Sequence, residues 1–120
     1  MKTDRELALM FKALAAPTRI TMVRMLKKRV LCVGALARLL EITPGAVSQH
    51  LGVLKEVRLV EGEKRGYFMH YRLNPETLAL WQEALGDFLS APKELEPCVF
   101  LKPGEGLCAP VKPNVKNPRS

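Results

Sequence analysis

The sequence contains few of the residues from which enzyme active sites are usually built. Its 120 residues include two histidines, one tryptophan and three cysteines, and only 6% of them are aromatic. It has no Cys-x-x-Cys pair, no Ser/His/Asp arrangement and no glycine-rich loop able to cradle a phosphate. These absences argue against an enzyme such as a thiol oxidoreductase, and we predict a protein without catalytic activity.

Long hydrophobic runs are also missing. No apolar stretch reaches the roughly 18 residues that a membrane-spanning helix requires. The amino-terminal stretch MKTDRELALMFKAL carries acidic residues and lacks a cleavage site of small residues, so it does not resemble a secretory signal. We therefore expect no membrane partner and a cytoplasmic location, where an odd set of three cysteines does not form a permanent disulfide framework.

Positive charge is in excess. The chain has 19 lysines and arginines against 12 aspartates and glutamates, which gives a formal net charge of +7. This excess favours a polyanionic partner, either nucleic acid or an anionic membrane surface. A basic protein with no such partner would have the same composition, so the charge alone does not decide between these alternatives.

Apolar periodicity and capping residues predict five helices and one β-hairpin. The helices are expected at residues 4–15, 17–29, 33–40, 44–57 and 75–89. Side chains alternate in period two over residues 67–73, which predicts a strand paired with residues 59–64 through a turn near Arg65 and Gly66. The expected fold class is therefore mainly α with a small β-hairpin (α+β).

The composition changes near residue 92. Most of the nine prolines lie beyond this point, and the helical periodicity stops there. We expect one domain at residues 1–91 and a flexible, cysteine-containing carboxy-terminal tail at residues 92–120.

The helices expected at 33–40 and 44–57, followed by the basic hairpin, form the pattern of a winged helix-turn-helix. One face of the second helix is apolar, with Val47, Leu51 and Leu54, whereas the opposite face carries short polar residues and glycines. Such a face allows close approach to DNA base edges, although an ordinary solvent-exposed helix is the alternative. The expected DNA-binding residues are Thr43, Gly45, Ser48, Gln49, His50, Lys55, Lys64, Arg65 and Tyr67.

The first and last helices have apolar faces that a small core does not fully use. Packed against the same helices of a second copy, they would form a homodimer whose two recognition helices meet half-sites about one DNA turn apart. The alternative is that these side chains only fill the core of one chain, and we expect both uses. The expected interface residues are Leu7, Phe11, Trp81, Leu85 and Phe88.

The order of these parts resembles the ArsR/SmtB family of bacterial metal-responsive repressors, of the arsenical-resistance type. The resemblance covers about residues 7–89, and SQHLGVLKEVRLV and RGYFMHYRL carry it in combination. It implies a homodimeric winged-helix protein that binds double-stranded operator DNA of its own operon. Binding of an inducer then releases the repressor and permits expression of efflux or detoxification genes.

The stretch LCVG is similar to the first half of the Leu-Cys-Val-Cys-Asp-Leu box of the family's arsenic, lead and cadmium sensors. Cys32 matches the first thiol of this box, whereas Gly34 replaces the second thiol and Ala35 replaces the aspartate. The family's zinc site on the last helix needs histidines there, and residues 75–91 contain none. The familiar sites of the family are therefore incomplete in this chain.

Three cysteines remain as ligands for a thiophilic inducer. Arsenite takes three sulfur ligands, and the prolines and glycines between Cys98 and Cys108 allow the ends of that loop to approach each other. We therefore expect As(III) as the inducer, held by Cys32, Cys98 and Cys108, within one subunit or across the dimer. The alternatives are a thiol redox or persulfide switch, a Cd²⁺ or Pb²⁺ sensor, and inert thiols in a DNA-binding protein that has no inducer.

Overall fold

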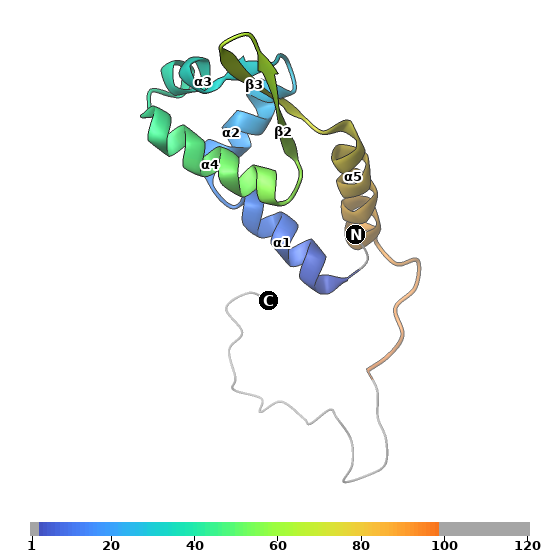
Figure 1. Cartoon of the computed structure of the whole chain (residues 1–120). Helices are drawn as coiled ribbons and strands as arrows, with labels where there is room; N and C mark the ends of the chain where they lie inside the picture. Colours follow the sequence, from blue (N-terminus) through green and yellow to red (C-terminus); the bar gives the residue numbers. More distant parts are fainter. Residues whose placement is uncertain (1–2, 99–120) are drawn as a thin grey trace, which may run out of the picture. The chain divides into compact units, whose positions relative to one another are not determined.

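The structure is a computed structural model that describes residues 3–98 of the chain. The chain divides into two units, one ending at Ser90 and one beginning at Ala91, and the described helices and strands all lie in the first (Figure 1). These elements are α1 (Asp4–Leu14), α2 (Pro17–Leu26), β1 (Leu31–Cys32), α3 (Val33–Leu40), α4 (Pro44–Glu56), β2 (Val60–Arg65), β3 (Phe68–Leu73) and α5 (Pro75–Leu89). The prediction of a mainly helical winged helix-turn-helix fold with a small hairpin is confirmed.

Prolines and short polar caps set the starts of the longer helices. Pro17, Pro44 and Pro75 each lie in the first turn of a helix, where the missing N–H group has no partner to lose. Thr43 and Asn74 precede two of these prolines, and their side chains accept hydrogen bonds from backbone N–H groups of the first turn. The sequence therefore determines where α4 and α5 begin.

Helices α1 and α4 each end one residue earlier than expected, and α2 ends three residues earlier. The structure ends α2 at Leu26, whereas the basic run had suggested a helix to residue 29. The backbone N–H groups of Lys28 and Arg29 both donate to the carbonyl oxygen of Met25, at 3.0 and 3.3 Å, which closes the helix in a tight turn. Within the described part of the chain, no helix combines the length and the hydropathy needed to cross a membrane.

The hairpin of β2 and β3 turns at Gly66. Its backbone φ of +62° is a conformation that glycine adopts without the cost paid by other residues. The second strand begins at Phe68, so Tyr67 lies in the turn and not in the strand, which corrects the prediction by one residue. Figure 1 shows the hairpin projecting beyond the helices that pack beneath it.

A third strand, β1, was not expected from the sequence. Its two residues, Leu31 and Cys32, pair antiparallel with Tyr71 and His70 of β3, which gives the sheet the order β1-β3-β2. Two residues are too few to show the period-two alternation by which strands are recognised in a sequence. The pairing places the start of α3 directly beside the hairpin.

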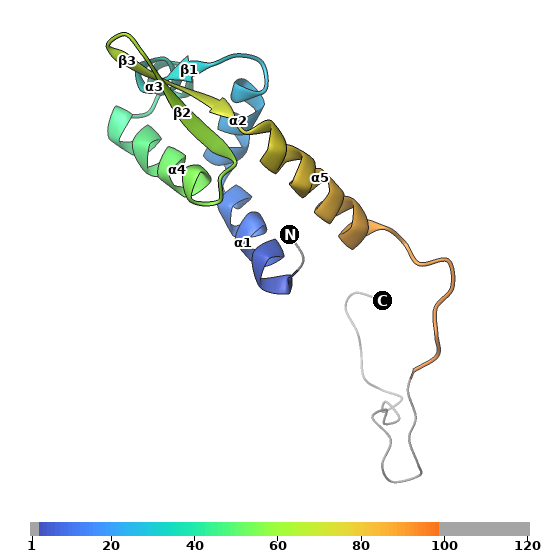
Figure 2. The ribbon, with the colours of Figure 1, turned by 45° about the vertical axis from the view of Figure 1, so that its right-hand side comes forward.

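Helix α4 contributes more buried side chains to the core than any other helix or strand that the structure describes. Seven side chains are almost completely buried: Met10, Met22, Leu36, Val47, Leu51, Leu54 and Leu59. Three of these belong to α4, and burial of each such side chain contributes about 1.5–3 kcal/mol relative to its exposure. The core therefore fixes the rotation of α4 about its axis, and the opposite face of the helix lies on the surface (Figure 2).

Candidate nucleic-acid interface and thiol site

The outward face of α4 consists mostly of uncharged residues, with Glu56 at its carboxy-terminal end. Gly45, Ser48, Gln49 and Gly52 are all exposed, whereas the predicted inward residues are buried. A Cβ atom added at Gly52 would have no neighbour within 4 Å, so the backbone is open to solvent there. A base edge can approach such a surface closely, and the amide of Gln49 can both donate to and accept from adenine.

Three other residues of the predicted interface have partners within the protein. The hydroxyl of Thr43 accepts a hydrogen bond from the first turn of α4, at 3.1 Å. The Nδ1 atom of His50 lies 3.2 Å from a guanidinium nitrogen of Arg19, and the ammonium of Lys55 lies 5.8 Å from the ring centroid of Tyr71. At ~100° per residue, His50 and Lys55 point to different sides of α4.

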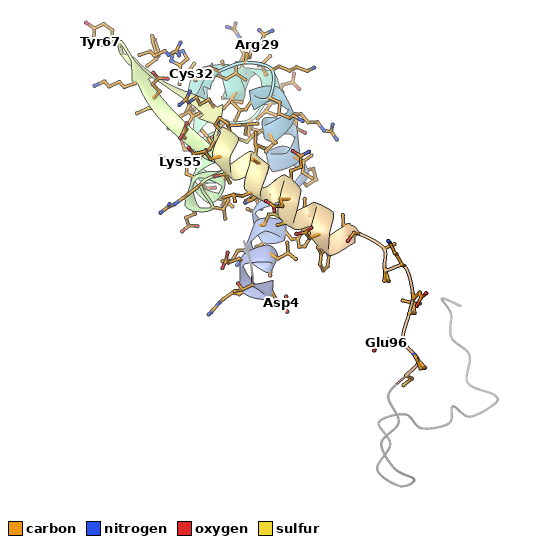
Figure 3. All side chains as sticks on the ribbon, turned by 90° about the vertical axis from the view of Figure 1, so that its right-hand side faces the viewer. Asp4, Arg29, Cys32, Lys55, Tyr67 and Glu96 are labelled. Atoms are coloured by element: carbon orange, nitrogen blue, oxygen red, sulfur yellow. The ribbon has the colours of Figure 1, made fainter. Side chains whose placement is uncertain are left out.

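The tip of the hairpin carries the remaining residues of the predicted interface. Lys64, Arg65 and Tyr67 are exposed, and Tyr67 is completely so. Figure 3 shows Tyr67 at the outer end of the hairpin. Arg65 lies 3.5 Å from Glu63, but both side chains are more than half exposed, so this ion pair leaves the arginine available to another partner. The adjoining Phe68 is also 63% exposed, which sequence reasoning did not anticipate.

Cys32 is the residue that caps α3. Its sulfur accepts a hydrogen bond from the backbone N–H of Ala35 at 3.4 Å, and its side chain is partly buried. A thiol sulfur is a weak acceptor, so it satisfies this N–H group less well than an oxygen does. The thiol is free of any disulfide and remains available to an incoming ligand.

The strand pairing gives Cys32 neighbours that are distant in the sequence. His70 of β3 lies directly opposite Cys32 in β1 and opposite Glu63 in β2, so the three side chains point to one face of the sheet. The Nδ1 atom of His70 is buried and has no hydrogen-bond partner among residues 3–98. In that same range, no group of three or more metal-ligating side chains is close enough to hold an ion.

The other two predicted thiol ligands are not part of the first unit. Cys98 is an exposed free thiol of the second unit, and Cys108 lies outside the described residues. A site formed by Cys32, Cys98 and Cys108 therefore stays a prediction.

The predicted dimer residues divide into two groups. Phe11 of α1 and Phe88 of α5 contact each other, with ring centroids 5.9 Å apart, and both remain exposed. By contrast, Trp81 is only 5% exposed and belongs to the core of the single chain, and Leu7 and Leu85 pack partly against that core. The exposed group alone is fully available to a second copy.

The sequence of this chain is similar to the sequences of known bacterial regulatory proteins. Residues 16–62 match the family described as bacterial regulatory protein, arsR family. The transcriptional repressor SmtB of Mycobacterium tuberculosis (strain CDC 1551 / Oshkosh) is 41% identical over 70 residues, and the match spans 58% of this chain but only 52% of that protein. The arsenical resistance operon repressor of Bacillus subtilis (strain 168) is 33% identical over 100 residues, which are 82% of this chain and 85% of that repressor.

Solved structures agree with the sequence comparison. A protein described as a possible transcriptional regulator for arsenical resistance has a TM-score of 0.61 and 36% identity, over 67% of this chain and 83% of that one. The two sequence relatives are named as repressors and the structural one as a regulator, which are not enzymes. The chain belongs to the arsR family of bacterial regulatory proteins.

Proposed function

We propose that this chain represses transcription by binding operator DNA as a homodimer and leaves the DNA when As(III) binds its thiols. The observation that carries the DNA-binding half is the exposed face of α4, where small polar residues lie opposite three buried apolar ones. The net charge of +7 and the basic tip of the hairpin supply the attraction to phosphates on which such binding depends.

Exposed apolar side chains on α1 and α5 support the dimer. They are Phe11, Leu80, Phe88 and Leu89, each at least 41% exposed. Apolar residues gathered on neighbouring helices are typical of a surface that another protein covers. A two-fold axis at this surface would present two copies of α4 to two half-sites about one DNA turn apart.

The inducer site begins at Cys32. As(III) is thiophilic and takes three sulfur ligands, and Cys98 and Cys108 are the only other thiols of the chain. Each ligation step exchanges a hydroxide of arsenite for a thiolate: the thiol proton and the hydroxide leave together as water, and no electron transfer is needed. Three such steps give one arsenic atom bound by three sulfurs.

The position of Cys32 suggests how ligation reaches the DNA-binding helix. A sulfur bonded to arsenic accepts the hydrogen bond from Ala35 less well, and the bond also pulls on the first turn of α3. Since α3 packs against α4, a shift of α3 changes the placement of the recognition helix. Release requires that As(III) bind the DNA-free form more tightly, and a coupling of ~3 kcal/mol corresponds to about a hundredfold loss of DNA affinity.

A second inducer class is favoured by the pairing of Cys32 with His70. An imidazole nitrogen beside a thiolate suits a divalent ion such as Cd²⁺ better than it suits As(III), and Nδ1 of His70 is unpartnered among the described residues. A redox or persulfide switch would use two cysteines and no histidine. The variant His70→Gln separates these cases, because it would weaken a response to Cd²⁺ and leave the responses to arsenite and persulfide unchanged.

The proposal is tested by fluorescence anisotropy of the reduced protein on a labelled duplex from its own upstream region. Arsenite, Cd²⁺, Pb²⁺, Zn²⁺ and a persulfide donor are added in separate titrations at fixed salt. We expect tight binding that arsenite reverses, and reversal at much higher doses in the double variant Cys98→Ser/Cys108→Ser. Wild-type arsenite response in that variant would exclude the tail thiols as ligands, and an unchanged anisotropy with every additive would exclude the thiol-sensing function.

A further inference from the structure

The side chain of Arg19 joins three elements of the first unit. It lies in the first turns of α2, and its Nε donates to the carbonyl oxygen of Ala13 at 2.6 Å while Nη2 donates to that of Lys12 at 3.3 Å. Its Nη1 lies 3.2 Å from Nδ1 of His50 in α4. One guanidinium therefore contacts both the carboxy-terminal end of α1 and the recognition helix.

Because of these contacts, the guanidinium of Arg19 is bound within the protein and is not a free cation on the surface. The last carbonyl groups of a helix have no partner within that helix, and Arg19 donates to two of them at the end of α1. The carbonyl of Lys12 also accepts from the backbone N–H of Ala15, so Arg19 is the second donor there. A side chain fixed by three hydrogen bonds to its own protein gains little by extending to a phosphate. Sequence reasoning treats this arginine as part of the general positive charge, and the structure gives it a specific partner.

The contact with His50 determines where the proton of that ring lies. A guanidinium has five N–H donors and no acceptor, so Nδ1 of His50 must be the acceptor of the hydrogen bond. The imidazole is then neutral and carries its proton on Nε2. The ring is partly exposed, and Nε2 makes no hydrogen bond to any residue that the structure describes.

The location of His50 indicates what Nε2 would meet. On α4 it follows Gln49, which lies on the exposed face, and at ~100° per residue it lies between the exposed and the buried faces of the helix, where it is partly buried. When a recognition helix lies in the major groove, the DNA backbone passes along its sides, and most protein–DNA hydrogen bonds go to phosphate and sugar. A neutral N–H donor at this place suits a phosphate oxygen.

We propose that Arg19 is a positioning residue, which holds His50 in the Nε2–H tautomer so that this N–H donates to a DNA backbone phosphate. The inference rests on the proposed DNA binding, but its first half concerns the free protein alone. Under this proposal, Arg19 affects DNA affinity only through His50, and Arg19 itself does not contact a phosphate.

The tautomer is tested first, on the free protein, by long-range ¹H–¹⁵N correlation spectra of the imidazole rings. The chain has only two histidines, so His70→Gln assigns the signals. We expect an unprotonated Nδ1 and a protonated Nε2 for His50, and a mixture of tautomers in Arg19→Lys, which keeps the charge but loses the planar fork. A protonated Nδ1 on His50 in the wild-type protein would overturn the proposal without reference to DNA.

The second test measures anisotropy on the upstream duplex and on a scrambled duplex of equal length, over a range of salt concentrations. We expect His50→Ala to weaken binding to both duplexes about five- to tenfold, as loss of one hydrogen bond would. We expect Arg19→Lys to weaken it about twofold, because a mixture of tautomers leaves about half of the protein with a proton on Nε2. The double variant should be no weaker than His50→Ala, and the salt dependence should not change. The matched control is Arg24→Lys, an exposed arginine of the same helix, which should leave affinity unchanged.

The outcomes distinguish the possible failures. Additive losses in the double variant would show that Arg19 contacts the DNA independently of His50. A loss confined to the upstream duplex would indicate a base contact by His50, and no loss at all would remove His50 from the interface. Failure of the wild-type protein to bind either duplex would refute the DNA-binding function itself, and the tautomer result would stand independently.

Discussion

The two helices of the helix-turn-helix begin with the same hydrogen-bond pattern but with different atoms. At α4 the hydroxyl of Thr43 accepts from the N–H of Ala46 at 3.1 Å, and at α3 the sulfur of Cys32 accepts from the N–H of Ala35 at 3.4 Å. The oxygen cap is strong and chemically inert, whereas the sulfur cap is weak and can bond to soft ions. The helix that we propose faces DNA thus begins at an inert cap, and α3 begins at a thiol that can bond to a soft ion.

Both helices are anchored in the same core, and breaking that anchor should have the largest effect. Leu36 of α3 and Leu51 of α4 are at most 2% exposed, so we expect Leu36→Ala and Leu51→Ala each to lower the free energy of unfolding by about 2–5 kcal/mol. Chemical denaturation measures this. Leu39 of α3 is 58% exposed, so Leu39→Ala should change stability by no more than about 0.5 kcal/mol. Equal costs for Leu36 and Leu39 would contradict the described orientation of α3.

The outward faces of the two helices should differ in their effect on DNA affinity. We expect Gln49→Ala to weaken binding to the upstream duplex by about 1–3 kcal/mol, because we propose its amide as the base-reading group of α4. The unfolding free energy should not change, since the side chain is exposed. Leu39→Ala on α3 serves as the control and should bind DNA normally. An unaltered affinity in Gln49→Ala would place the base contacts elsewhere.

The caps themselves should give the smallest effects. Thr43→Ala should lower the unfolding free energy by about 1 kcal/mol, the usual cost of losing an oxygen cap. We expect Cys32→Ala to cost less, because sulfur is the weaker acceptor, and Cys32→Ser to be at least as stable as the wild-type protein. Thermal denaturation of the three variants measures the order. If Cys32→Ala lowered stability more than the other two variants, the main role of Cys32 would be to stabilise the fold.

Local signals explain which parts of this arrangement could be predicted. Proline and a polar cap mark the starts of α4 and α5, and the apolar period fixes which side of α4 is buried. The pairing of Arg19 with His50 joins residues 31 positions apart, and no local pattern encodes such a contact. The position of His70 opposite Cys32 likewise depends on β1, whose two residues gain their extended form from the sheet and not from their own propensity.

For Cys98 and Cys108, no sequence pattern predicts where the side chains lie in space. Their placement beside Cys32 was inferred from chemistry, because As(III) needs three sulfurs and the chain has three thiols. Neither lies in the unit that ends at Ser90, so the prediction of a three-sulfur site is decided by experiment.

We propose that the thiol of Cys32 converts As(III) binding into release of DNA. The most direct measurement compares arsenite titrations of the wild-type protein and of Cys32→Ser, each bound to the upstream duplex. The serine variant keeps an oxygen at the cap of α3 and removes only the thiol chemistry. We predict equal DNA affinity without arsenite, release of the wild-type protein by arsenite, and retention of the variant at the same doses. Release of Cys32→Ser at wild-type doses would contradict the account.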